Sequence, residues 1–238
     1  MGRAGIFPSH IGFESAVGKD CSTLTRSLMA ENSPYYEAGV KLSYTTADDR
    51  WFMSALILNG WQRIQRVDGN SLPAFGTQLT FRPGDAWTIN SSTFVGADTP
   101  DAGRRMRYFH DLYAIFQPAG RVAVTVAFDI GGEEKSVDDS DLNSWWSAVA
   151  IVSVTAGEKW NVAARGEYYH DAHNVIIASP AAGFRTTGVS INADHQVTEN
   201  VVWRTEVRGF FSPDPVFAEG TGFTDNNIFA GTSLALSF

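Results

Sequence analysis

The histidines are the first candidates for chemistry in this sequence. His170, Asp171 and His173 have a spacing that metal sites use, but they begin a long loop and no second ligand cluster follows. We therefore expect a solvated loop there. His110 and His195 have no evident serine partner on the same strand face, which a nucleophilic site requires. The expectation is a protein without enzymatic activity, without a cofactor and without a metal ion.

An acidic run at residues 133–141 is the next candidate, because carboxylates bind divalent cations. It lacks the ordered spacing of a calcium loop, so a soluble acidic loop within residues 131–143 is the better interpretation. The net charge of -8 and the pI of about 5.0 argue against a nucleic-acid surface. Cys21 is the sole cysteine, so no internal disulfide can form.

Charged residues alternate with apolar ones near the end of the chain. In residues 200–211 one parity carries Val201, Trp203 and Val207, and the other carries three charged residues. A charged face must point to water or to the lumen of a barrel, because an arginine facing lipid costs about 2 to 4 kcal/mol at the bilayer midplane. The apolar parity is therefore the face that meets lipid or a core.

Long and short connections alternate along the whole chain. Tight turns near residues 46–49, 82–85, 118–120 and 156–159 separate long loops, and the strands between them have about the length that crosses a bilayer at a tilt. Mean hydropathy is -0.12, which a barrel permits because half of its strand positions face water. The pattern predicts eleven strands from Glu37 onward and a twelfth at Arg3 to Phe7. The expected fold class is all-β: a transmembrane antiparallel up-and-down β-barrel of about 12 strands, in a single domain over residues 1–238.

Strand parity assigns side chains to the lumen. The parity is undecided for residues 51–60, which are apolar on both sides, and for residues 107–117, where His110 and Asp111 compete. Charges on the inner face either line the pore or pair to hold the barrel shape, and the two roles are compatible. The expected lining residues are Lys41, Arg82, Asp129, Arg165, Glu167, Arg204, Glu206 and Arg208.

Aromatic residues cluster near the ends of the predicted strands. Those after the short turns fit a girdle at the periplasmic interface, and those beside the long loops, such as Tyr108, Trp145 and Phe210, fit the second girdle. The aromatic last residue fits the closing strand of an outer-membrane barrel. The periplasmic girdle is expected to contain Trp51, Trp87, Trp160, Trp203 and Phe238.

Residues 8–36 form the longest stretch without alternation. Loops of this length are usually functional or disordered. One hypothesis is that the stretch from Pro8 to Pro34 folds into the mouth of the barrel and narrows it, with Glu14, Lys19, Asp20 and Arg26 at the constriction. The alternative is an exposed external loop.

The first sixty residues carry the runs RAGIFPSHIGFES, TRSLMAENSPYYEAGVKLSYTT and LILNGW. These resemble the OmpL-like β-barrel porin family, also called porin-2, and the Arg-x-Glu strands at 165–167 and 204–206 resemble strands near the end of those proteins. Members of the family are longer, so a larger barrel shortened at its N-terminus is the alternative to a twelve-stranded one. The residues that match are Gly5, Phe7, Pro8, Gly12, Glu14, Arg26, Ser27, Gly39, Val40, Leu58, Asn59, Gly60 and Trp61.

The expected function is that of a porin in the bacterial outer membrane, which lets small hydrophilic solutes or ions diffuse passively through a charged lumen. Its partners would be outer-membrane lipid, the solutes, the barrel-assembly machinery and either further copies of itself or another protein. Two alternatives stay open. One is a non-conducting barrel that anchors or assembles through its external loops, and the other is a soluble all-β binding protein. No signal peptide is visible after Met1.

Overall fold

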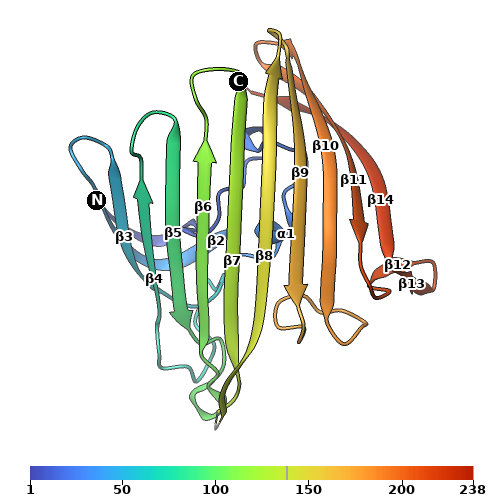
Figure 1. Ribbon diagram of the computed structural model, residues 1–238. Coiled ribbons are helices and arrows are strands. Elements are labelled where there is room, and N and C mark those ends of the chain that lie inside the picture. Colours follow the sequence, from blue (N-terminus) through green and yellow to red (C-terminus); the bar gives the residue numbers. More distant parts are fainter. Residues whose placement is uncertain (138, 238) are drawn as a thin grey trace.

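The computed structural model of the protein describes residues 1–137 and 139–237. Twelve strands form one antiparallel sheet, which curves around an inner space (Figure 1). Alternating side chains make these segments strands, because a period of two gives each strand one apolar and one polar face. The strands of this sheet are β1 (Gly2–Pro8), β2 (Tyr36–Thr45), β3 (Trp51–Leu58), β4 (Ala74–Phe81), β5 (Trp87–Gly96), β6 (Arg107–Phe116), β7 (Val122–Ser136), β8 (Asp139–Ala156), β9 (Trp160–Asp171), β10 (Phe184–Thr198), β11 (Val201–Phe211) and β14 (Asn226–Leu236).

Every strand of the sheet pairs with its neighbour in the sequence, in the order β1 to β11 followed by β14. The small hairpin of β12 (Phe217–Glu219) and β13 (Gly222–Thr224) lies in the loop between β11 and β14. Within the described residues, β1 pairs only with β2, and β14 pairs only with β11. The predicted fold class, with twelve antiparallel up-and-down strands, is confirmed.

Helical elements are few and short: the 3-10 turns η1 (Gly18–Asp20) and η2 (Asp101–Gly103) and the single-turn helix α1 (Leu28–Glu31). Among the described residues, no helix has the length and apolar character needed to cross a bilayer.

The two ends of the sheet differ in their connections. The short turns, such as 46–50 and 82–86, lie at the upper end in Figure 1, and the loops 59–73, 97–106 and 172–183 lie at the other end. One expectation about these loops was wrong. The acidic segment 131–143 is not a loop, because β7 continues to Ser136 and β8 begins at Asp139. The strands run on because Glu133 and Glu134 still pair across to Asn143 and Leu142.

The outer face of the sheet is apolar and the inner face carries most of the polar groups. Ile191 and Val207 point outward with exposures of 65% and 54%, whereas Glu206 on the inner parity is fully buried. An apolar exterior of this kind is what a lipid bilayer solvates. Residues 9–35, which connect β1 to β2, lie against part of the inner face and bond side chains of β9, β10 and β11.

The structure settles the two strands whose parity the sequence left undecided. In β3, Leu56 and Leu58 face inward, where an apolar core containing Phe7 and Phe94 accommodates them. In β6, Asp111 faces inward and His110 faces outward. An outward carboxylate would meet lipid, whereas the His110 imidazole bonds the Ser91 hydroxyl at 2.9 Å.

Four of the predicted girdle tryptophans lie at the short-turn end of their strands, outside the inner core. Trp51 stacks on Phe81 with 4.2 Å between ring centroids, and Trp87 packs beside Phe116. Trp160 packs against His195, and Trp203 donates a hydrogen bond to the Thr232 hydroxyl at 2.7 Å. Phe238 lies outside the described residues. The girdle role itself stays a prediction.

Trp145 does not belong to a girdle, contrary to expectation, because it points inward and is 1% exposed. It is the cross-strand partner of Gly131, and a Cβ atom on Gly131 would lie 2.1 Å from the Trp145 ring. The missing side chain of Gly131 therefore makes room for the indole. Arg107 covers the same ring at 5.8 Å from its centroid.

We expect Gly131→Ala to lower the free energy of unfolding by about 1 to 3 kcal/mol, because a methyl group would force the Trp145 ring out of its site. Urea denaturation in detergent micelles, followed by tryptophan fluorescence, measures this change. Gly166→Ala is the control, since a Cβ atom there meets nothing within 4 Å. Equal losses in the two variants would contradict the role assigned to Gly131.

Candidate functional site

The candidate site is the inner segment, residues 9–35, together with the inner faces of β9, β10 and β11. Figure 1 shows α1 behind β7 to β9, in the space that the curved sheet encloses. The segment therefore folds inward. The helix in this segment, α1, is capped locally, because the Ser27 hydroxyl accepts a hydrogen bond from Ala30 N at 3.2 Å.

Charged side chains on β9 and β11 form a buried network beneath this segment. An amino group of Arg165 lies 2.8 Å from Glu206 Oε1, and one of Arg208 lies 2.5 Å from Glu167 Oε1. Arg165 Nε is also 3.4 Å from Glu167, which ties the two pairs together. All four side chains are at most 5% exposed. Buried charges need hydrogen bonds as well as ionic partners. The remaining donors and acceptors of these four side chains must therefore bond other groups nearby.

The strand register explains why these charges meet. Ser190 in β10 is the cross-strand partner of both Arg165 and Arg208, so the two arginines flank one small residue. Gly188 plays the same part for Glu167, since a Cβ atom on Gly188 would lie 2.6 Å from that side chain. Small residues on β10 thus leave the space in which long side chains from β9 and β11 come together.

The inner faces of β9, β10 and β11 form the wall of the site. Carboxylate and amide oxygens of this wall accept hydrogen bonds from the backbone of the inner segment. Glu206 Oε2 accepts from Thr25 N at 2.7 Å, and Glu167 Oε2 accepts from Leu28 N at 2.6 Å. Asn192 Oδ1 accepts from Leu24 N at 2.9 Å. Three side chains, one each from β9, β10 and β11, therefore satisfy amide groups that have no partner of their own in an irregular segment. Each bond fixes the height of the segment above the strands.

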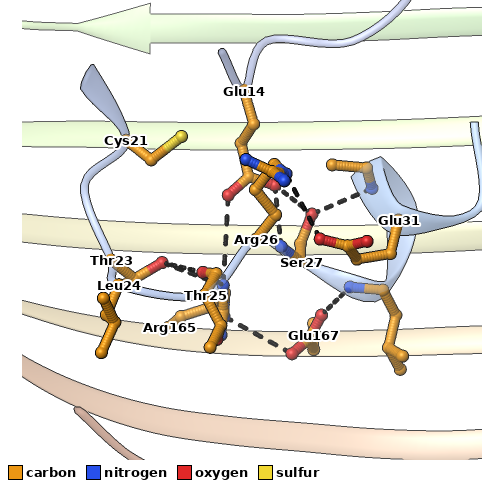
Figure 2. Close-up of polar contacts among 12 residues, drawn as sticks. Glu14, Cys21, Thr23, Leu24, Thr25, Arg26, Ser27, Glu31, Arg165 and Glu167 are labelled. Atoms are coloured by element: carbon orange, nitrogen blue, oxygen red, sulfur yellow. Dashed lines mark hydrogen bonds and ion pairs between the residues drawn. The ribbon is translucent and has the colours of Figure 1, made fainter. Parts of the chain in front are cut away.

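The arginines of the wall donate to the carbonyl groups of the same segment. Arg165 donates to Thr25 O at 2.7 Å, and Arg208 donates to Arg26 O at 2.9 Å. Arg204 donates to Cys21 O at 2.8 Å and also to Gly18 O, while its Nε bonds Asp194 at 2.9 Å. Figure 2 shows Thr23 and Thr25 above Arg165 and Glu167. The wall thus acts as a template that holds the segment along its length.

A second attachment lies at the start of the segment. His10 Nδ1 is 2.7 Å from Glu37 Oε1, and His10 Nε2 is 2.8 Å from Thr93 O. The ring lies over Gly76, where a Cβ atom would be 2.7 Å from it, so glycine is required for this close approach. His10 O accepts from the Ser92 hydroxyl at 2.8 Å. The segment is therefore anchored to the walls on two sides of the inner space.

Two carboxylates lie next to each other beneath this anchor. Asp111 and Asp129 are cross-strand partners on β6 and β7 and are 0% and 3% exposed. Asn90 donates to Asp111 at 3.3 Å. Among the described residues, the Oδ1 atom of each aspartate has no hydrogen-bond partner. The expected lining residue Asp129 is thus on the inner face but covered.

The four residues expected at the constriction have different positions. Glu14 does not reach the solvent: its side chain is 2% exposed, and its carboxylate accepts hydrogen bonds from the Ser27 amide at 2.9 Å and from the Ser27 hydroxyl (Figure 2). Burial raises the pKa of the Glu14 carboxyl, and the two bonds from Ser27 oppose that effect. Lys19 and Asp20 pair with each other at 2.8 Å and are half-exposed. Arg26 is partly exposed, 3.2 Å from Glu31 and over the ring of Tyr35.

Of the eight expected lining residues, the structure brings four together in the network on β9 and β11. Arg204 lies on the same face of β11 and pairs with Asp194 of β10. Lys41 lies apart on β2, where its ammonium donates to Gln78 at 3.4 Å. Arg82 follows the end of β4 and is exposed in the turn 82–86. Sequence reasoning gave His10, Ser27 and Asn192 no role in a site, although Ser27 is among the residues that match the family. His10 could have been found, since it lies within the run FPSHIG that carries the family resemblance.

An up-and-down sheet with an apolar exterior, a charged interior and a segment folded inside defines the class of outer-membrane porin channels. The family model described as "Putative beta-barrel porin-2, OmpL-like" matches residues 3–238, so the chain belongs to this family. The resemblance expected from the N-terminal runs is confirmed. The protein is accordingly a porin-type channel of the bacterial outer membrane, where lipid surrounds it.

Solved structures show the same fold at low sequence identity. The outer membrane channel DcaP of Acinetobacter baumannii superposes with a TM-score of 0.69 and 14% identity, over 100% of this chain and 71% of that chain. The anion-selective porin from Comamonas acidovorans superposes with a TM-score of 0.57 and 9% identity, over 83% of this chain and 55% of that chain. No curated protein matches the sequence.

Proposed function

We propose that the protein lets small hydrophilic solutes or ions diffuse passively through the outer membrane, with the inner segment as a fixed constriction. The observation that carries this proposal is the set of bonds between the segment and the wall. Arg165, Arg204 and Arg208 each bond at least one segment carbonyl, and Glu167 and Glu206 each bond a segment amide. Because these bonds hold the segment in place, it narrows the lumen to a constant width.

In this proposal the wall charges on β9 and β11 shape the constriction, while more exposed charges meet the solute. Lys19, Asp20 and Arg26 lie on the segment, and Lys41 lies on β2. Charges of both signs around a narrow passage favour small hydrated solutes over apolar ones. Arg82 would contribute at the short-turn mouth.

A non-conducting barrel is the second candidate, and the same network favours it. The charged side chains of β9 and β11 bond the inner segment, and a plug would need the same bonds to stay in place. The external loops would then bind a partner protein. Ion conductance of the refolded chain in a planar bilayer separates the two functions. Discrete channel openings are expected, and a chain that inserts but passes no current would reject the channel in favour of the anchor.

A further inference from the structure

A recess opens at the loop-side mouth, away from the network beneath the inner segment. Its volume is about 510 Å³. It is lined by residues of the loops 59–73, 97–106 and 172–183, by residues 31–33, and by the ends of β6 and β7. The side chains that matter for its chemistry are Trp61, Arg63, Asp98, Arg105, Arg107 and Glu133.

Five of these side chains form a line of alternating charge. Arg63 Nε lies 3.6 Å from Asp98, which lies 4.0 Å from Arg107. Arg107 continues to Glu133 at 2.6 Å, and Glu133 lies 3.3 Å from an amino group of Arg105. Three guanidinium groups alternate with two carboxylates, so the line carries one excess positive charge and ends in a cation on each side.

The terminal arginines of this line are also more exposed than its carboxylates. The Arg63 and Arg105 side chains are 50% and 41% exposed, whereas Asp98 and Glu133 are 14% and 12% exposed. The carboxylates are also occupied, since Asp98 Oδ1 accepts from Trp61 N at 3.1 Å and Glu133 Oε2 accepts two bonds from Arg107. Arg63 and Arg105 each face one of these carboxylates, at 3.6 and 3.3 Å, and the outer parts of both guanidinium groups are open to solvent. The recess therefore presents two half-exposed guanidinium groups to a solute, while its carboxylates are largely buried.

The other walls of the recess are partly apolar and nearly neutral. Trp61 packs under Arg107, with 5.4 Å between the guanidinium carbon and the ring centroid, and Val175 and Ile176 also line the recess. The remaining lining carboxylate, Glu31, faces Arg26 at 3.2 Å. A ligand that fits these walls has an anionic group for the arginines and a short carbon body.

We propose that this recess is a binding site for small organic carboxylates, which it concentrates at the loop-side mouth before they pass through the lumen. The inference rests on the proposed channel function for its purpose, but binding in the recess does not require conduction. Guanidinium groups bind carboxylates through paired, charge-assisted hydrogen bonds, and this geometry selects them over a spherical anion such as chloride.

Isothermal titration calorimetry of the refolded full chain in detergent, at low ionic strength, tests the proposal. Benzoate is the probe, and benzamide has the same shape without the charge. Benzoate is expected to bind at least about tenfold more tightly than benzamide, because a charge-assisted pair contributes more than a neutral hydrogen bond. Equal affinity for the two compounds would overturn the proposal.

The double variant R63Q/R105Q is expected to weaken benzoate binding about tenfold or more, since both exposed guanidinium groups are lost. The matched control is R50Q/R121Q, which removes two exposed arginines from turns at the opposite end of the sheet. Retained benzoate affinity in R63Q/R105Q, or an equal loss in the control, would reject the site. Bilayer conductance of the same preparations keeps the questions apart: conduction without binding rejects only the recess, and binding without conduction rejects only the channel.

Discussion

Replacing Arg165 by methionine is expected to lower the free energy of unfolding by about 3 to 5 kcal/mol, the usual cost of removing one partner from a buried ion pair. The Arg165 side chain is fully buried. It donates to Glu206 at 2.8 Å and to two groups of Thr25, at 2.7 and 3.1 Å. Methionine has a similar length but no donor, so these acceptors lose their partner in a site that water does not reach. Urea denaturation of the refolded protein in detergent measures the loss.

Arg185→Met is the matched control for this variant, because it makes the same substitution in an exposed ion pair. Arg185 lies 2.7 Å from Asp214, and the two side chains are 46% and 38% exposed. Exposed pairs contribute about 0 to 1 kcal/mol. A loss in Arg165→Met no greater than the loss in Arg185→Met would contradict the buried network.

A double-mutant cycle separates the Arg165–Glu206 pair from the rest of the network. Glu206→Gln keeps an acceptor for Thr25 N but removes the negative charge that Arg165 neutralises. The double variant R165M/E206Q is therefore expected to lose less stability than the sum of the two single variants.

The fold was predictable from the sequence because the main constraint on it is local. Alternation within each strand and the lipid cost of charge fix which parity faces outward, as in β9, where Val162 and Ala164 oppose Arg165. β3 was ambiguous for a physical reason: its inner residues Leu56 and Leu58 face an apolar core instead of water. An alternation rule cannot separate two apolar faces.

The position of individual charges was less predictable because it depends on contacts between distant segments. The sequence shows that Arg204 and Arg208 share a face, but it does not show that backbone carbonyls of residues 18 to 26 would be their acceptors. Glu14 was expected at the constriction because its contact within the folded segment could not be seen in the sequence either. Its actual partner, Ser27, lies on another turn of the same irregular segment, where no periodicity guides the prediction.

Trp145 shows how packing overrides a positional rule. A tryptophan near the end of a strand usually lies at the membrane interface. Here the cross-strand partner is Gly131, which leaves a space on the inner face that the indole fills. The acidic run was misjudged in a related way, since its composition suggested a loop while cross-strand pairing extends β7 and β8 through it.

Deleting residues 16–23 is expected to raise single-channel conductance several-fold, because the passage widens where the segment no longer fills it. The deletion removes Cys21 O and Gly18 O, the acceptors of Arg204, and the Thr23 hydroxyl, which accepts from Arg165 at 2.9 Å. Arg204 would keep Asp194 but lose both carbonyl acceptors of its amino groups, which would then face the lumen. Selectivity should therefore shift toward anions, measured as a reversal potential in a salt gradient. Deleting residues 217–224 is the control of equal length, since it removes the hairpin of β12 and β13, which lies beyond the ends of β11 and β14 in Figure 1. An unchanged conductance in the first variant would reject the constriction, whatever the control shows.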